Sequence, residues 1–485
     1  MIQYYKFISE DKFYLYDTST SYLIEISKTI YDILDDFIGG KAVLKIISEH
    51  TDIDKNEIEK AVTEIKKFQK EFRILQDSPF DGFLFPTAKK DIEDQLRNNM
   101  CHVILNITDD CNFRCIYCKY GDTYEFEKFH AKKHMDNKTA IQSIDFLLNN
   151  SHDSEELTVG FYGGEPVLRF DLIKSVVNYI LSKTDKRVRF SLTTNGSLIG
   201  KRVIEYFIDH SFKLTISIDG PAEIHNRYRK SISGRNTYYK IIKTIKEIKK
   251  IDKEYYNKHV GFSVVIAPPF HLYSLYEFFN SEQINNQAPI FANLADYYDT
   301  SFYNRFPKSI WKDYKHQKEQ LRKIFHDKIK NRVNDNSSLL WSLFGDKAVK
   351  LHNRPNGYNG NRLYPLGICT PGVHVTFIDT NGELFICERV GKHLSIGNIH
   401  QGFDVEKIAQ TINDFVNVIT KHGCIECPFV RICPSCYVDA RRNNSLSNEK
   451  LKASCPSKKQ GIKEVLHDYA YITQSYPDLL EKYIS

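Results

Sequence analysis

The stretch CNFRCIYC, residues 111–118, places three cysteines at C-x3-C-x2-C spacing. It closely follows the apolar run Val103–Thr108, which has the length and composition of a buried parallel strand. A loop leaving the end of such a strand holds the thiols of Cys111, Cys115 and Cys118 near one another. Three thiolates can bind three irons of a [4Fe–4S] cube and leave the fourth iron open to a ligand. Zinc is the alternative, although it usually takes four ligands in two pairs, and the odd number of thiols disfavours a disulfide.

Length, charge and cysteine distribution limit the possible functions. At 485 residues and a net charge of +6, the chain is long enough for several domains and too weakly basic to predict nucleic-acid or membrane binding. The N-terminus has no signal-peptide pattern, and no run approaches ~18 apolar residues, so we expect a soluble, cytoplasmic protein. Four of the 11 cysteines lie within residues 101–118, seven within 369–455 and none in the 250 residues between. Such clustering indicates metal or redox chemistry rather than scattered core cysteines.

Residues 1–88 are expected to form a small separate module. Short alternating segments bounded by polar turns predict strands. Ser27 then caps a predicted helix that Gly39 ends, and two amphipathic helices follow. The expected elements are strands over 4–8, 13–16 and 22–26, then helices over 28–38, 42–50 and 56–72.

Between residues 95 and 300, predicted strands and helices alternate. This order indicates an α/β unit with a parallel sheet and right-handed crossovers. Where such a sheet curls into a barrel, the active site lies at the carboxyl ends of the strands. The expected strands are 103–108, 157–162, 187–194, 213–218, 261–266 and 288–294.

Several of these strands end in polar or glycine-rich motifs. Gly163-Gly164-Glu165-Pro166 follows the second strand; its glycines allow close backbone approach, and its carboxylate can accept hydrogen bonds from an ammonium group. Thr-Thr-Asn-Gly, residues 193–196, ends the third strand, and Ser-Ile-Asp-Gly, residues 217–220, ends the fourth. Either of these two could be only a strand-ending turn.

The remainder of the chain departs from this alternation. Residues 301–360 predict a charged helical bridge. A second cysteine group follows, and a hairpin around Asn381-Gly382 is expected to bring Cys387 back towards Cys369. A closing helix is expected over 462–471, within a C-terminal segment 457–485. Two adjacent zinc sites are one possible use of the seven thiols in this group. The seven cysteines are Cys369, Cys387, Cys424, Cys427, Cys433, Cys436 and Cys455.

The C-x3-C-x-aromatic-C motif after a first strand is similar to that of the radical S-adenosylmethionine (SAM) superfamily, and Gly163–Pro166 resembles its GGEP motif. The resemblance implies a partial (β/α)6 TIM-like barrel over residues 95–300. It also implies a [4Fe–4S] cluster on Cys111, Cys115 and Cys118 that leaves one iron open to SAM. Residues 361–456 resemble the SPASM extension, which binds two auxiliary [4Fe–4S] clusters.

This resemblance also implies roles for single residues. Tyr117 would lie beside the adenine, Gly163, Gly164, Glu165 and Pro166 would bind the amino group, and Arg229 would bind the SAM carboxylate. The family often has Asp at the position of Asn226. The ribose and methionine contacts would come from Asn195, Ser217 and Asp219. The barrel-proximal auxiliary cluster would use Cys369, Cys387 and Cys436, and the distal cluster Cys424, Cys427, Cys433 and Cys455.

The module at residues 1–88 resembles the winged-helix precursor-recognition element of enzymes that modify ribosomally made peptides. Such an element binds a leader peptide by adding it as a strand to a sheet edge; a plain packing module is the alternative. The implied reaction uses a 5′-deoxyadenosyl radical to form an intramolecular peptide crosslink, with a thioether as first choice and a C–C or C–O bond as second. An anaerobic sulfatase-maturating enzyme that forms formylglycine, and a zinc-binding peptide scaffold without turnover, are the alternatives.

The expected cofactors are therefore SAM and three [4Fe–4S] clusters. The expected partners are a leader-bearing precursor peptide and an external electron donor such as flavodoxin or ferredoxin. Neither a nucleic acid nor a membrane is expected as a partner.

Overall fold

The computed structural model describes residues 2–76, 80–85, 88–124, 130–282, 284, 289–297, 299–333, 339–358, 360, 362–365 and 367–483. Its central element is a mixed sheet whose first six strands are parallel. These strands are β5 (His102–Thr108), β6 (Glu156–Gly163), β7 (Arg187–Thr194), β8 (Lys213–Ser217), β9 (Val260–Ile266) and β10 (Ile290–Leu294). The expected strands of this region are confirmed, and the expected start at Ala288 lies outside the described residues.

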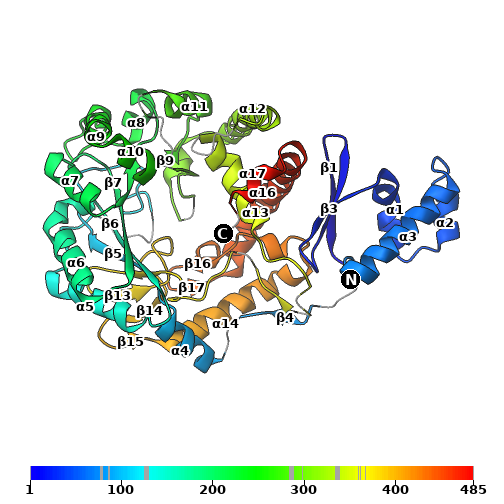
Figure 1. Ribbon diagram of the computed structural model, residues 1–485, viewed down its shortest axis with the longest axis horizontal. Coiled ribbons are helices and arrows are strands. Elements are labelled where there is room, and N and C mark those ends of the chain that lie inside the picture. Colours follow the sequence, from blue (N-terminus) through cyan, green and yellow to red (C-terminus); the bar gives the residue numbers. More distant parts are fainter. Residues whose placement is uncertain are drawn as a thin grey trace.

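Helices connect the parallel strands and cover the outer side of the sheet, as Figure 1 shows. The side chains of β5 to β9 that face these helices are almost entirely apolar and buried, which gives the barrel its core. The connecting helices are α5 (Asn137–Asn149), α6 (Phe170–Lys183), α7 (Lys201–Asp209), α8 (Ala222–Tyr228), α9 (Tyr238–Ile251), α10 (Lys253–His259) and α11 (Leu272–Asn280); α4 (Lys89–Asn98) precedes β5.

The same sheet continues into the C-terminal half of the chain. Beyond β5 come β12 (Thr376–Ile378), β13 (Glu383–Phe385), β14 (Ser395–Asn398) and β15 (Gly402–Phe403). The hairpin expected around Asn381-Gly382 is confirmed as the β12–β13 connection. Its first strand also pairs in parallel with β5, with Thr376 opposite Val103 and Ile378 opposite Leu105. The loops that follow β5 and β12 therefore lie side by side.

The N-terminal module is a three-stranded antiparallel sheet with three helices against one face. Ser27 caps the first helix through a side-chain bond to the amide of Ile30, as its sequence position predicts. The strand order is β1-β2-β3, so β3 is an edge strand. The elements are β1 (Tyr4–Ser9), β2 (Lys12–Asp17), β3 (Leu23–Ile26), α1 (Lys28–Ile38), α2 (Val43–Glu49) and α3 (Lys55–Phe72).

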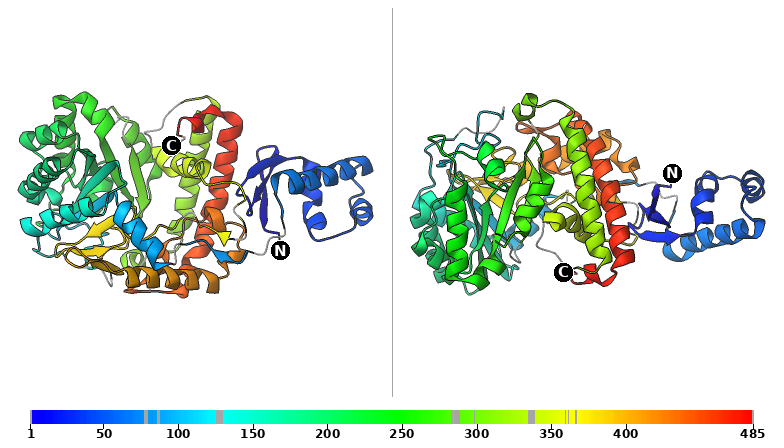
Figure 2. Two further views of the ribbon diagram at one scale, coloured as in Figure 1. Left: turned by 60° about the horizontal axis from the view of Figure 1, so that its bottom comes forward. Right: turned by 90° about the horizontal axis from the view of Figure 1, so that it is seen from above.

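A 28-residue helix, α16 (Asn448–Ser475), joins this module to the rest of the molecule. Phe7, Tyr14 and Tyr16 of the module pack against Leu466 and Ala470 of α16. Both views in Figure 2 place the module beyond α16, on the side away from the barrel strands. The helix expected over 462–471 is the C-terminal part of α16. None of the described helices is long and apolar enough to cross a bilayer.

The remaining elements connect these parts. The bridge expected over 301–360 contains a long helix, a π-helical turn and a short helix in its described residues. They are α12 (Ile310–Lys330), η3 (Trp341–Gly345) and α13 (Asp346–His352). The other elements are β4 (Gly82–Phe83), η1 (Pro166–Arg169), η2 (Phe302–Arg305), β11 (Arg362–Leu363), α14 (Val405–Lys421), η4 (Cys424–Glu426), η5 (Val430–Ile432), α15 (Tyr437–Ala440), β16 (Arg441–Arg442), β17 (Ser445–Leu446) and α17 (Asp478–Glu481).

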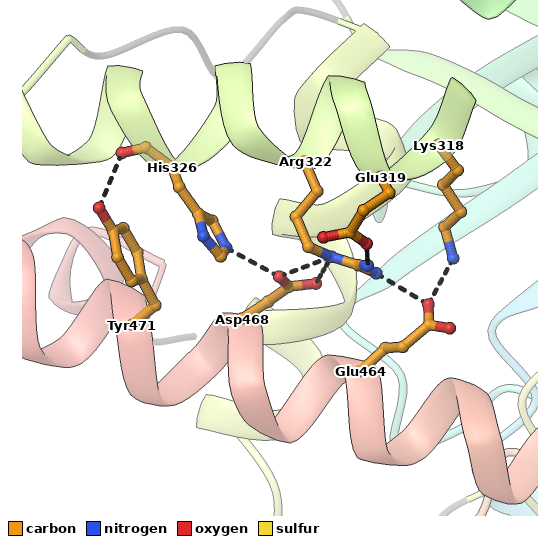
Figure 3. A network of polar contacts seen from close by, with 7 residues as sticks. All are labelled: Lys318, Glu319, Arg322, His326, Glu464, Asp468 and Tyr471. Atoms are coloured by element: carbon orange, nitrogen blue, oxygen red, sulfur yellow. Dashed lines mark hydrogen bonds and ion pairs between the residues drawn. The ribbon is translucent and has the colours of Figure 1, made fainter. Parts of the chain in front are cut away.

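A network of charged side chains fastens α12 to α16 (Figure 3). Arg322 contacts Asp468 at 3.0 Å and Glu464 at 2.8 Å, and Lys318 contacts Glu464 at 2.7 Å. Burial alone would raise the pKa of Glu464, but the two cations outweigh it and lower the pKa to about 2. The network thus links the bridge to the helix on which the N-terminal module rests.

We expect Leu466→Ala to lower the free energy of unfolding by about 2–4 kcal/mol, because it leaves a cavity between α16 and the N-terminal sheet. Leu466 is fully buried in this interface. Urea denaturation followed by fluorescence measures the change. Leu181→Ala, at a position 49% exposed on α6, is the control and should change stability by less than about 0.5 kcal/mol. Equal effects of the two variants would contradict the interface.

Candidate functional site

The loop after β5 brings Cys111, Cys115 and Cys118 together in a buried environment. Burial raises the pKa to about 12 for Cys111 and Cys115 and to about 11 for Cys118; a backbone hydrogen bond or Arg229 offsets part of the rise, and a neighbouring thiol adds to it. Backbone hydrogen bonds hold this loop against the segment after α8. One of them runs from the Arg114 amide to the Lys230 carbonyl at 2.8 Å. Thiols in such surroundings ionise only if a cation compensates their charge, so this donor set suits a buried iron–sulfur cluster.

Glu165 lies fully buried at the end of β6. Its carboxylate accepts hydrogen bonds from the Thr194 hydroxyl at 2.7 Å and from the amides of Asn195 and Val167 at 2.7 and 3.1 Å. Burial nevertheless dominates and raises the pKa of Glu165 to about 7. Pro166 occupies the first position of the short helix η1, which Glu165 caps.

Gly163 and Gly164 pack against the backbone of the cysteine-bearing loop. A Cβ atom on Gly163 would lie 2.1 Å from the Thr108 carbonyl oxygen, and one on Gly164 would lie 2.1 Å from that of Asp110. The amides of Gly164 and Glu165 donate to the same two carbonyls at 2.8 Å. These glycines thus allow two loops to touch, and their contact with a ligand stays a prediction.

Asn195 connects the end of β7 to the cysteine-bearing loop. Its side-chain amide donates to the Asn112 oxygen at 2.8 Å and lies 3.9 Å from Cys111 Sγ. Asn112 in turn donates to Ser197 at 2.8 Å. Sequence reasoning did not select Asn112; its place inside the cysteine motif was the available signal.

Tyr117, Asp219 and Arg229 form a second buried group of polar side chains. Asp219 accepts from the Tyr117 hydroxyl, from Arg229 Nε at 2.9 Å and from the Val265 amide at 3.0 Å. The Arg229 guanidinium also lies 5.6 Å from the centre of the Tyr117 ring. Both Asp219 oxygens are therefore engaged by protein donors, which fixes the ring and the guanidinium. Ser217, the last residue of β8, is largely buried close by.

Asn226 caps the following helix. Its side-chain oxygen accepts from the amides of Thr237 and Tyr238 at 3.0 and 3.1 Å. An Asp oxygen could accept the same two bonds, so this departure from the family pattern retains the cap at α9.

His225 was missed by sequence reasoning and supports the same group. The Thr237 hydroxyl donates to the Arg229 carbonyl at 2.9 Å, so His225 Nε2 donates to that hydroxyl at 3.0 Å. The other ring nitrogen then accepts from the Asp219 amide at 3.3 Å. Burial lowers the pKa of His225 to about 4, in keeping with this neutral ring.

Cys369, Cys387 and Cys436 form a second group. Burial raises the pKa of Cys369 to about 12, and the nearby Cys387 and Cys436 thiols add to the rise. The pKa of Cys387 rises to about 11, first through burial. Cys436 stands at the start of α15, where its amide donates to Asp439 at 2.9 Å.

The second group lies next to the first. Lys119, which follows Cys118, donates from its ammonium group to the Arg389 carbonyl at 3.4 Å. Burial raises the pKa of Tyr162 above its usual value, and the charges of Glu388 and Cys118 on its two sides raise it further. The loops carrying the two groups of thiols are thus in direct contact.

A third group of four cysteines lines one largely apolar cavity under the start of α16. Burial raises the pKa of Cys424 to about 12, with further contributions from the other three thiols. Lys459 faces the same space and lowers the pKa of Cys424, Cys427 and Cys455 somewhat. The cavity is lined by Cys424, Cys427, Cys433 and Cys455, by apolar residues that include Phe415, Ile419, Phe429 and Ile462, and by Lys458 and Lys459.

Among the described residues, no three Cys, His, Asp or Glu side chains converge on a point suited to one metal ion. A zinc ion would need its sulfur ligands about 2.3 Å from a common centre. A [4Fe–4S] cube attaches each thiolate to a different iron, so its ligands can stand farther apart. Sets of three or four cysteines without another ligand type are the donor sets that [4Fe–4S] clusters use.

Comparison with known proteins identifies the class of the barrel. Residues 105–266 match the Radical SAM superfamily, and the chain thus contains a radical SAM domain, which implies SAM and one [4Fe–4S] cluster. The solved structure of native anSMEcpe with bound AdoMet has a TM-score of 0.59 and 20% identity, over 79% of this chain and 99% of that one. At this identity the likeness establishes the fold.

Two curated relatives extend the comparison. The radical SAM cyclopropyl synthase TigE of Paramaledivibacter caminithermalis is 22% identical over 57% of this chain and 57% of its own length. The cysteine-type anaerobic sulfatase-maturating enzyme of Clostridium novyi is 24% identical over 69% of this chain and 86% of its own length. The chain spans about half the length of some curated relatives that it matches.

We expect SAM affinity to fall about fivefold between pH 7 and pH 6, because the Glu165 carboxylate, with a pKa of about 7, must be ionised to accept the SAM ammonium group, which stays largely protonated in this range. Equilibrium dialysis of SAM across this range measures the change. Glu165→Gln should bind weakly and remove the pH dependence. Thr194→Val removes a hydrogen bond that favours the ionised form of Glu165, so the midpoint of the pH dependence of SAM binding should move to higher pH in this variant. A Glu165→Gln variant with an unchanged pH profile would contradict this role.

Proposed function

We propose that the chain is a radical SAM enzyme that forms an intramolecular crosslink in a ribosomally made precursor peptide, with a thioether as the first-choice bond and a C–C or C–O bond as the second. The observation that carries the proposal is the presence of three separate groups of buried or half-buried thiols in a chain with a radical SAM domain. The first group would hold the SAM-binding cluster. The others would hold auxiliary clusters on Cys369, Cys387 and Cys436 and on Cys424, Cys427, Cys433 and Cys455.

The residues around the first group have the chemistry that SAM requires. When bound, the cluster and SAM would supply a 5′-deoxyadenosyl radical for hydrogen abstraction. Glu165 would accept bonds from the SAM ammonium group, and Arg229 would bind its carboxylate. Tyr117, held by Asp219, would pack beside the adenine, and Asn195 and Ser217 would line the ribose and methionine. The protein orients the target and excludes water.

The edge strand β3 of the N-terminal sheet, which pairs only with β2 in the described part of the chain, supports a peptide substrate. The Asp17 amide donates to the Tyr22 carbonyl at 2.9 Å, so Asp17 and Tyr22 are a hydrogen-bonded pair at the end of the β2–β3 ladder. Hydrogen-bonded and non-bonded pairs alternate in an antiparallel ladder, so the backbone amides of Leu23 and Glu25 point away from β2. A leader peptide could add to β3 as a further strand. Electrons would come from an external donor such as flavodoxin or ferredoxin.

An anaerobic sulfatase-maturating activity is the second candidate, favoured by the match to 86% of the length of the Clostridium novyi enzyme. Residues 1–88 argue for the peptide crosslinking enzyme, because a sulfatase-maturating enzyme does not need such a module. A zinc-binding scaffold without turnover is disfavoured by the match of residues 105–266 to the Radical SAM superfamily. Reaction of the modified peptide with a hydrazine separates the first two: formylglycine is an aldehyde and forms a hydrazone, whereas a crosslinked peptide has lost two hydrogens and carries no aldehyde.

The combined change Cys111→Ala, Cys115→Ala, Cys118→Ala should abolish 5′-deoxyadenosine formation and lower the iron content from about twelve to about eight per chain, because it removes one cluster of three. Iron analysis, the absorbance near ~400 nm and chromatography of the nucleoside measure both effects in protein purified without oxygen. Cys101→Ala lies outside the three groups and serves as the control. Colourless wild-type protein, or nucleoside formation by the triple variant, would overturn the proposal.

Glu25→Pro should weaken precursor binding at least about tenfold, because proline blocks the outward amide of β3 without removing a bond to β2. SAM cleavage without peptide should remain. Glu25→Ala is the matched control, since the Glu25 side chain contacts Lys12 at 2.8 Å on the surface and its loss alone should matter little. Fluorescence anisotropy with a labelled leader measures binding, and equal affinity of all three proteins would exclude strand addition at β3.

A further inference from the structure

A buried lysine lies between the barrel and the C-terminal half of the sheet. Lys392 Nζ is 2.8 Å from both carboxylate oxygens of Asp109 and 3.9 Å from Asp379 Oδ2. The three side chains are only 8%, 2% and 3% exposed, respectively. Sequence reasoning did not select Lys392 or Asp109, and left Asp379 without a role.

Each member of this group belongs to a different loop. Asp109 follows β5 and precedes Cys111 by two residues, and Lys392 follows Cys387 by five. Asp379 begins the β12–β13 turn, where its Oδ1 accepts from the amides of Asn381 and Glu383 at 2.8 and 3.1 Å. One cation thus connects the loop of Cys111 with the loop of Cys387.

The group is anchored on both sides. The side-chain amide of Asn106 donates to the Asp109 carboxylate at 2.8 Å, and the Asp109 backbone amide donates to the Lys133 carbonyl at 2.9 Å. A carboxylate buried in this way is tolerated only while its counter-charge stays close. Moving either loop outward would separate the charges in a low-dielectric interior, so the ion pair resists relative movement of the two loops.

We propose that Lys392 is a positioning residue that holds the Cys111 loop and the Cys387 loop at one separation. The inference rests on the proposed function, because that separation matters for chemistry only if both loops carry clusters. Catalytic groups work when they are held within about 0.5 Å of the productive geometry. The ion pair supplies such a restraint where β5 and β12 share only three paired positions.

Hydrogen–deuterium exchange tests the restraint directly in the purified full-length protein. Lys392→Met should raise the exchange rate at least about tenfold in both residues 106–112 and residues 387–394, because Asp109 loses its partner. Lys392→Arg keeps the charge and should restore most of the protection. Lys318→Met is the matched control: it removes a similarly enclosed lysine, 18% exposed, from the network in Figure 3 and should leave both loops unchanged.

The cluster-loaded protein provides a second readout. Lys392→Met should alter the magnetic interaction between the two neighbouring clusters in the reduced protein and lower the crosslinked peptide formed per 5′-deoxyadenosine at least about fivefold. Where Lys392→Met fails to fold, the charge-compensated pair Asp109→Asn, Lys392→Met replaces it and should show the same changes. Faster exchange in only one loop, or in both loops of Lys318→Met, would overturn the positioning role. Failure of the proposed function is distinct: the wild-type protein would then form no 5′-deoxyadenosine, whatever the exchange data show.

Discussion

The parallel pairing of β5 with β12 is the contact on which the arrangement of the molecule depends. Only three residue pairs make this contact, yet they join strands that lie about 270 residues apart in the chain. Because parallel strands end at the same edge of a sheet, the pairing places the loop of Cys111 beside the loops that carry Asp379 and Cys387. Without it, the radical SAM domain and the second group of thiols would share no common framework.

Burial of the cysteines is the second constraint. A buried thiol stays protonated unless a cation compensates its charge, and the pKa of every cysteine in the first group is raised. The surrounding protein supplies few cations: Arg229 faces Cys115 but is bound to Asp219. Iron bound to these thiols would provide the missing positive charge, which couples folding of this region to assembly of its cofactors.

Local sequence signals predicted most of the elements but not their long-range contacts. Ser27 marks a helix start and Asn381-Gly382 marks a hairpin, because a single side chain or turn decides each of these structures. The union of β12 with β5 could not be predicted, since hydrophobic periodicity does not say which strands pair. The bonds that Asp219 accepts from Tyr117, Arg229 and Val265 could not be predicted either, because these residues are far apart in the chain; its contact with SAM stays a prediction. The assignment of cofactors to individual cysteines still depends on motif spacing.

The position of the N-terminal module gives the proposed enzyme a further property. Its sheet rests on α16, the helix that also carries Cys455, and lies away from the barrel strands. A leader bound at β3 would be held far from the radical. The length of the peptide between the bound leader and the reacting residue would then determine which residue reaches the radical. The number of residues in that spacer, more than the identity of the side chains near the crosslink, would then select which position of the peptide is modified.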